Sequence, residues 1–192
     1  MIAILKYNAG NIKSVQNALT RLGCESIITD NPEEITKAKK VIFPGVGEAS
    51  SAMNYLRERG LDKVLVSLTQ PVLGICLGLQ LMCRSSEEGN TRCMGIFGTD
   101  VKIFPPLEKI PHMGWNNFLT LKGSLFRGLK TADDVYYVHS YYAEICSDTS
   151  ATCEYILPFS AALQKDNFHA TQFHPEKSAA AGEKILKNFL EL

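Results

Sequence analysis

The sequence of 192 residues contains no CxxC pair, no Cys/His cluster with zinc-finger spacing and no apolar N-terminal run long enough for a signal peptide. It also lacks an excess of charge of either sign, because 20 Lys and Arg balance 20 Asp and Glu. These absences argue against a zinc module, a secreted disulfide scaffold and a nucleic-acid-binding domain, which would need a basic surface. We therefore expect a cytoplasmic protein with six reduced cysteines, no metal and no cofactor.

The longest uncharged stretch, residues 64–83, is long enough to suggest a membrane span. Polar residues and a proline interrupt it at Ser67, Thr69, Gln70 and Pro71. A continuous apolar span is therefore absent, and we interpret the stretch as a buried strand followed by a buried helix.

The first half of the chain alternates short apolar runs with segments of helical periodicity. The predicted strands are 2–5, 26–29, 40–43 and 72–75, and the predicted helices begin near residues 12, 32, 49 and 77. This alternation predicts an α/β fold with an open, mainly parallel sheet and helices on both faces.

The second half contains shorter strand-like runs separated by Gly, Pro and Asp turns. These runs are 101–104, 117–121, 135–138, 142–145, 160–164 and 168–173, and a helix is expected over 178–192. We interpret the runs as antiparallel additions to the sheet. Because the chain contains no linker or repeat, we expect one domain over residues 1–192.

A candidate nucleophile lies where the fourth predicted strand ends, in the segment Gly74-Ile75-Cys76-Leu77-Gly78. This is the Gly-x-nucleophile-x-Gly pattern of a sharp strand-to-helix turn, with cysteine in the middle position. Such a turn presents Cys76 at the carboxyl edge of the sheet, where α/β proteins bind ligands, and at a helix N-terminus that favours the thiolate. The pattern alone is equally compatible with a buried core cysteine.

A cysteine nucleophile needs a base, and His174 in His174-Pro175-Glu176 is the candidate. Proline favours an extended conformation at His174, so the side chains of residues 174 and 176 project to the same side and Glu176 can orient the imidazole. The alternative is a surface histidine beside a helix-capping carboxylate. Of the other histidines, we expect His169 to be structural and regard His112 and His139 as possible binding residues.

These two motifs resemble those of the class I (triad) glutamine amidotransferases. Within that family, further segments are similar to the glutaminase subunits of imidazole glycerol phosphate synthases: Tyr7-Asn8-Ala9-Gly10-Asn11, Pro44-Gly45-Val46-Gly47, Pro111-His112-Met113-Gly114-Trp115-Asn116 and Tyr137-Val138-His139-Ser140-Tyr141. The resemblance extends from the first strand to the last helix.

The resemblance implies that Cys76 attacks the side-chain amide of glutamine, that His174 transfers protons and that Glu176 orients His174. It implies an oxyanion hole from the backbone N–H groups of Val46 or Gly47 and of Leu77, glutamine contacts at Gly47, Gln80, Ser140 and Tyr141, and a partner interface with an ammonia exit at Trp115, Tyr136 and Lys177. The implied partner is a (β/α)₈-barrel cyclase subunit, which uses the ammonia to make imidazole glycerol phosphate and aminoimidazole carboxamide ribotide in histidine biosynthesis.

The sequence departs from the family pattern at two places. Lys6 to Asn11 replaces the usual Asp-Tyr-Gly-x-Gly-Asn, and Ala170 replaces the usual glycine before Thr171; neither change removes a catalytic group. Other functions compatible with the residues are a glutaminase for a chorismate-using or surface-sugar synthase, a catalytically silent α/β regulatory module, and a cysteine peptidase or γ-glutamyl hydrolase. The two glycines around Val46 also suggest a loop that can flip and switch the oxyanion hole.

Overall fold

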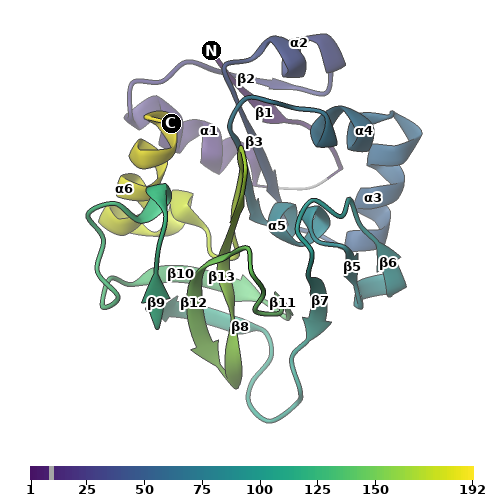
Figure 1. Cartoon of the computed structure of the whole chain (residues 1–192). Helices are drawn as coiled ribbons and strands as arrows, with labels where there is room; N and C mark the ends of the chain where they lie inside the picture. Colours follow the sequence, from purple (N-terminus) through teal and green to yellow (C-terminus); the bar gives the residue numbers. More distant parts are fainter. Residues whose placement is uncertain (9–10) are drawn as a thin grey trace.

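The computed structural model describes residues 1–8 and 11–192. Its main element is an eight-stranded sheet in the order β2-β1-β3-β4-β14-β13-β12-β9 (Figure 1). The strands of this sheet are β1 (Ile2–Leu5), β2 (Ser26–Thr29), β3 (Lys40–Gly45), β4 (Val72–Cys76), β9 (Thr120–Leu121), β12 (Thr149–Tyr155), β13 (Leu157–Lys165) and β14 (Phe168–Thr171). β1, β2, β3, β4 and β14 are joined by parallel pairs, so the predicted mainly parallel α/β sheet is confirmed.

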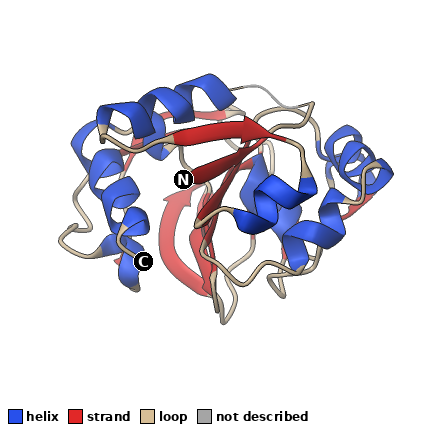
Figure 2. Cartoon of the chain, turned by 90° about the horizontal axis from the view of Figure 1, so that it is seen from above, coloured by secondary structure: helices blue, strands red, loops and turns tan. Residues whose placement is uncertain are grey.

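Helices cover both faces of this sheet, as the view from above shows (Figure 2). α1 (Ile12–Arg21) and α6 (Ala179–Leu190) pack on one face, and α2 (Pro32–Lys37), α3 (Ala49–Glu58), α4 (Leu61–Val66) and α5 (Leu77–Met82) pack on the other. Each face of the sheet has its own hydrophobic core, because successive side chains of a strand point to opposite faces. In β1, Ile2 and Ile4 face α1 and α6, whereas Ala3 and Leu5 face the other helices. Within the described residues, none of the helices combines the length and apolarity that a membrane crossing requires.

Two smaller sheets and three short 3₁₀ helices complete the described structure. β8 (His112–Asn116) pairs with β10 (Val135–His139), and a second sheet has the order β11-β7-β5-β6. The strands of the second sheet are β5 (Ser85–Ser86), β6 (Thr91–Arg92), β7 (Asp100–Ile103) and β11 (Tyr141–Ala143), and the 3₁₀ helices are η1 (Glu88–Asn90), η2 (Ser124–Phe126) and η3 (Pro175–Lys177).

The prediction for the second half was correct in part. β9 and β13 overlap the predicted runs 117–121 and 160–164 and belong to the main sheet through antiparallel pairing with β12, a strand that was not predicted. The predicted runs 101–104, 135–138 and 142–145 instead form β7, β10 and β11 of the smaller sheets. The run 168–173 was wrongly assigned as a purely antiparallel addition, because β14 pairs parallel with β4 and antiparallel with β13. Pairing partners far apart in the chain decide these sheets, and local patterns do not contain that information.

The parallel order places three loops at one edge of the sheet. β3, β4 and β14 are neighbours, with Gly45 opposite Cys76 and Thr171 opposite Ile75. Their carboxyl ends therefore converge, and the segments that follow β3, β4 and β14 meet where α/β sheets bind ligands. The segment Tyr7-Asn8-Ala9-Gly10-Asn11 also leads away from a parallel strand, but its two central residues lie outside the described residues.

Candidate active site

Cys76 occupies a strained turn between β4 and α5. Its backbone has φ 53° and ψ −107°, a conformation that non-glycine residues rarely adopt and that costs about 1–3 kcal/mol. Gly78 allows α5 to pack tightly against β3, because a Cβ atom there would lie 1.9 Å from the carbonyl oxygen of Phe43. The predicted sharp turn is therefore present, and close packing of the backbone maintains it.

The sulfur of Cys76 contacts one acceptor and one donor. The carbonyl oxygen of Val138 lies 3.9 Å from it, and the side-chain amide nitrogen of Gln172 lies 3.7 Å from it. Cys76 is 6% exposed and also packs in the hydrophobic core that contains α1 and α6 side chains.

His174 and Glu176 form a buried pair beside this sulfur. Nδ1 of His174 is 2.8 Å from Oε1 of Glu176, and their side chains are 1% and 0% exposed. Burial alone would lower the pKa of His174, but its interactions with Cys76 and Glu176 raise the pKa to about 10. Although the imidazole and the thiol are electrostatically coupled, Nε2 of His174 makes no well-aligned hydrogen bond with a described residue. Catalytic hydrogen bonds are often loose before substrate binds.

Several contacts fix the His174 segment. The backbone N–H of His174 donates to the carbonyl of Tyr136 at 2.9 Å, and Oγ of Ser178 donates to the carbonyl of His174 at 2.6 Å. The side-chain amide of Asn11 donates to the same Glu176 oxygen that contacts His174. The pair is thus attached to β10, to α6 and to the start of α1.

A cavity of about 300 Å³ opens over Cys76. It brings together every residue predicted for the oxyanion hole and for glutamine contacts, and its walls are Val46, Gly47, Cys76, Leu77, Gln80, Glu88, Pro111, Val138, His139, Ser140 and Tyr141. His174 and Glu176 do not line this cavity, although His174 interacts with the Cys76 thiol that does. The arrangement places a cysteine between a small-molecule cavity and a histidine–carboxylate pair.

Glu88 is a cavity residue that the sequence analysis did not identify. It is half-buried, burial raises its pKa, and its Oε2 accepts the backbone N–H of Ala49 at 2.8 Å. No sequence signal separates Glu88 from the adjacent Glu87, because only the folding of η1 against α3 directs Glu88 toward the cavity.

The four histidines have different surroundings. His139 lines the cavity and His112 lies behind it, with Nδ1 of His112 3.0 Å from Nε2 of His139. Burial lowers the pKa of His112 to about 4 and that of His139 to about 3, so both rings are neutral at pH 7. His169 packs beside Phe189 of α6, with 6.5 Å between ring centroids. His174 alone combines a carboxylate partner with the thiol.

Comparison with known proteins agrees with this geometry. The family model for glutamine amidotransferase class-I matches residues 3–192. The chain belongs to this family. It is 61% identical to the imidazole glycerol phosphate synthase subunit HisH of Bacteroides fragilis strain YCH46 and 45% identical to that of Escherichia coli K12, and each match covers 100% of the chain and 99% of the relative.

Solved structures with little sequence similarity share the fold of this amidotransferase. A structure described as glutamine amidotransferase has a TM-score of 0.76 at 18% identity, over 99% of this chain and 97% of that one. PurLQS from Thermotoga maritima has a TM-score of 0.74 at 14% identity, with the same two coverages.

The residues predicted for the partner interface form a cluster at the surface of the amidotransferase. Trp115 is 55% exposed, its ring centroid lies 5.9 Å from that of Tyr136, and Nζ of Lys177 lies 5.9 Å from the Tyr136 centroid. Trp115, Glu176 and Lys177 also line a second cavity of about 310 Å³. The cluster therefore adjoins Glu176.

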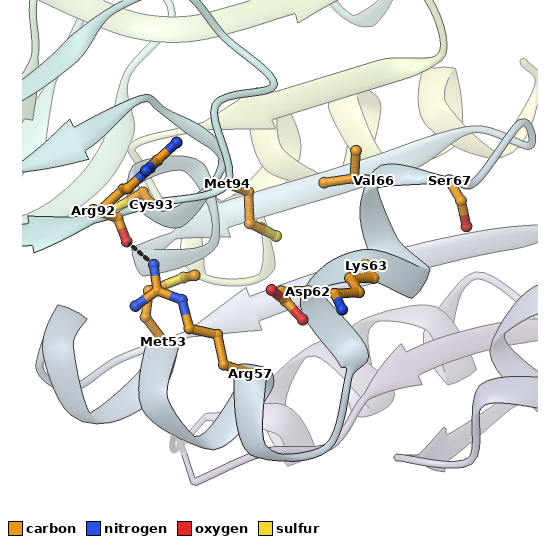
Figure 3. Close-up of a pocket in the computed structure, with 9 residues that line it drawn as sticks. All are labelled: Met53, Arg57, Asp62, Lys63, Val66, Ser67, Arg92, Cys93 and Met94. Atoms are coloured by element: carbon orange, nitrogen blue, oxygen red, sulfur yellow. Dashed lines mark hydrogen bonds between the residues drawn. The ribbon is translucent and has the colours of Figure 1, made fainter.

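A larger cavity, of about 670 Å³, lies between α3, α4 and the β6 segment (Figure 3). Arg57 there donates to the carbonyl of Arg92, and Cys93 lies in its wall. Burial raises the pKa of Cys93 to about 12, and none of the lining residues is a histidine. This cavity therefore holds a thiol without a histidine beside it, and the smaller cavity over Cys76 is the candidate active site.

Proposed function

We propose that the chain is the cytoplasmic glutaminase subunit of an imidazole glycerol phosphate synthase. It hydrolyses L-glutamine to glutamate and ammonia, and the ammonia reaches a (β/α)₈-barrel cyclase subunit that makes imidazole glycerol phosphate and aminoimidazole carboxamide ribotide in histidine biosynthesis. The observation that carries the chemistry is the position of Cys76, between a cavity and the His174–Glu176 pair. The full-length identity to subunits of that synthase supports the pathway.

In the first step, the sulfur of Cys76 attacks the side-chain carbonyl carbon of glutamine. The C–S bond forms, the carbonyl oxygen becomes an oxyanion, and the backbone N–H groups of the Val46–Gly47 loop and of Leu77 stabilise it. His174 gives its proton to the amide nitrogen, the C–N bond breaks and ammonia leaves. Because Glu176 contacts Nδ1 of His174, Nε2 is the atom that exchanges this proton.

In the second step, water hydrolyses the thioester. His174, now neutral, accepts a proton from water as the oxygen attacks the thioester carbon. The C–S bond then breaks, glutamate leaves, and the site returns to the thiolate with a protonated His174. Glu176 stabilises the imidazolium at both ends of the cycle.

The cavity offers groups of the right charge for the glutamine backbone. Glu88 is the carboxylate in its wall and suits the α-ammonium group, whereas Ser140 and Gly47 offer donors for the α-carboxylate. The amide nitrogen of Gln80 donates to Tyr141 and to Gln172, so its Oε1 is the atom left to accept from the ligand. We therefore assign Gln80 to glutamine recognition through its oxygen.

We place the cyclase on the surface of Trp115, Tyr136 and Lys177. Tryptophan and tyrosine are frequent in interface hot spots, and Trp115 and Met113 are 55% and 62% exposed on β8. We propose that ammonia leaves on that side, past the buried His174–Glu176 pair and through the adjoining cavity at Glu176 and Lys177. We also propose that docking there reorients the Pro44–Gly47 loop, in which Gly47 has φ 136°, a conformation that glycine adopts readily.

The test compares glutamate release by the chain alone, with a barrel cyclase, and with cyclase plus its acceptor ligand. We expect the isolated chain to be at least 100-fold slower, as when one oxyanion donor is missing. Cys76→Ala in the complex should abolish glutamine-dependent synthesis and retain synthesis from free ammonia. Equal turnover in all three mixtures would contradict the coupling, and failure of the cyclase to bind would contradict the pathway assignment.

A further inference from the structure

We propose that Gln172 is a further catalytic residue, whose side-chain amide donates a hydrogen bond to the Cys76 sulfur and favours the thiolate. Gln80 is the positioning residue that holds this amide in the donating orientation. The proposal rests on the proposed role of Cys76 as nucleophile.

Strand pairing places Gln172 beside the sulfur. β14 and β4 run parallel with Thr171 opposite Ile75, so the residues that follow, Gln172 and Cys76, emerge side by side at the sheet edge. Gln172 is fully buried, and its Nε2 lies 3.7 Å from the sulfur. Because the Gln172 side chain is fully buried, its neighbours hold it in place, and the contact with the sulfur follows from the fold.

The orientation of the Gln172 amide follows from its neighbours. The carbonyl oxygen of Tyr141 can only accept a hydrogen bond, so the group of Gln80 that lies 3.1 Å from it must be the NH₂ group. The same NH₂ group lies 3.1 Å from Gln172, which must therefore present its oxygen to Gln80. This leaves the NH₂ group of Gln172 facing Cys76.

A chain of hydrogen bonds holds the Tyr141 carbonyl from the other side. Because that carbonyl accepts, Nδ1 of His139 carries a proton and donates to it at 2.8 Å. Since His139 is neutral, its Nε2 accepts from Nδ1 of His112, and Nε2 of His112 accepts from the amide of Asn116. In this series of hydrogen bonds every donor points toward the Tyr141 carbonyl, so that carbonyl is held as an acceptor.

The sulfur therefore has two contacts with opposite preferences. The Val138 carbonyl, at 3.9 Å, can accept only from a thiol, whereas the Gln172 N–H bonds best to a thiolate. Among the described residues, the charged or titratable groups around this sulfur are His174 with Glu176, the neutral His139, Tyr7, and the cavity residues Glu88 and Tyr141. Burial, followed by the charge of Cys76, raises the pKa of Tyr7, so its phenol stays neutral.

The test measures how fast iodoacetamide alkylates Cys76 in the full chain as a function of pH, with mass spectrometry of the Cys76 peptide separating it from the other cysteines. This readout needs no glutamine. Gln172→Met removes the donor at nearly constant size, and Gln172→Glu replaces the NH₂ group with an oxygen.

We expect the alkylation midpoint to rise by about one pH unit in Gln172→Met and by more in Gln172→Glu. One pH unit corresponds to a tenfold change in the equilibrium between thiol and thiolate. Glutaminase kcat in the complex should fall about tenfold in Gln172→Met, with KM little changed.

Thr171→Val is the matched control, because Thr171 is a fully buried neighbour whose hydroxyl donates to the Phe173 carbonyl. Its midpoint should equal that of the unaltered chain.

If neither Gln172 variant folds, Gln80→Met decides, because it leaves Gln172 in place but frees its amide to rotate. An unchanged midpoint in the folded variants would overturn the proposal. Loss of the glutaminase assignment would appear separately, as glutamine turnover that survives Cys76→Ala.

Discussion

Two cavities of this molecule each have a buried cysteine in the wall, and their thiols are almost equally exposed: 6% for Cys76 and 7% for Cys93. Exposure therefore does not distinguish them. The sulfur of Cys93 lies 3.7 Å from the carbonyl of Thr91, a contact that suits only the protonated thiol. The sulfur of Cys76 has an amide donor and a histidine–carboxylate pair beside it.

The difference shows which features make a cysteine chemically useful. A thiolate needs donors or cations around it, and at Cys93 burial outweighs the nearby Arg57 guanidinium, so the pKa is raised and the neutral thiol is favoured. Cys93 lies at the start of a loop with ordinary backbone, whereas Cys76 has a strained backbone that presents its side chain to three converging segments. Cavity volume therefore does not identify the reactive thiol, because only the smaller cavity has a cysteine with an amide donor and a histidine–carboxylate pair beside it.

The largest expected effect tests this contrast directly. Cys76→Ser should reduce glutamine-dependent synthesis by a factor on the order of 10⁴ or more, because serine is a poor nucleophile beside a base tuned for a thiol. Cys93→Ser should change it by less than about twofold. Steady-state synthesis with glutamine, compared with synthesis from ammonia, measures both. A large loss in Cys93→Ser with the fold intact would mean that the second cavity takes part in the reaction.

The next effect concerns the backbone that presents Cys76. In Gly78→Ala, the new Cβ would meet the Phe43 carbonyl at 1.9 Å, so β3 and α5 must separate. We expect the free energy of unfolding to fall by about 1–3 kcal/mol, the usual cost of overpacking, together with a loss of glutaminase activity. Gly98→Ala is the control, since a Cβ there meets nothing within 4 Å. Urea unfolding measures the difference, and equal midpoints would contradict the close packing at Gly78.

The burial of His169 predicts a smaller effect, on the pH dependence of the free energy of unfolding. Burial lowers the pKa of His169 to about 4, so below about pH 6.5 the unfolded chain binds a proton that the folded chain does not. The free energy of unfolding should therefore fall as the pH drops from about 6.5 to about 4. His169→Gln should remove about 1–3 kcal/mol of this fall.

His174→Gln is the control for the acid experiment. The pKa of His174 is raised, so its stabilising contribution is complete below about pH 6.5 and is lost only as the pH rises toward 10. Replacing it should leave the acid slope unchanged. Urea titrations at pH 7, 6, 5 and 4.5 measure both variants, and a slope that His169→Gln does not alter would contradict the buried neutral state of His169.

The sequence predicted the first half of the fold well because β1 to β4 and the helices between them follow local periodicity. It missed α4, which is only six residues long, and the strands β8 and β12, which no predicted run covers. The pairing of β8 with β10 and of β7 with β11 could not be predicted, because each pair joins strands distant in the chain.

The candidate site divides in the same way. Cys76, His174 and Glu176 belong to short motifs whose spacing has a local mechanical reason, so the sequence alone suggested them. Glu88 and the contact of Gln172 with the sulfur depend on how η1 meets α3 and on the parallel pairing of β14 with β4. A one-dimensional pattern contains neither relation, and the structure was needed to identify both.

The smallest predicted effect tests how far the special surroundings of Cys76 extend. The amide of Asn11 donates to the Glu176 oxygen that orients His174. Asn11→Ala removes one of the two hydrogen bonds that described residues make to that carboxylate. Because Asn11 acts through Glu176, we expect glutaminase kcat to fall only about 3- to 10-fold, with KM unchanged. Asn8→Ala, which loses a weaker exposed contact with the Ser51 carbonyl, is the control and should be neutral. A matching loss in both variants would assign the effect to the loop as a whole, and not to the support of Glu176.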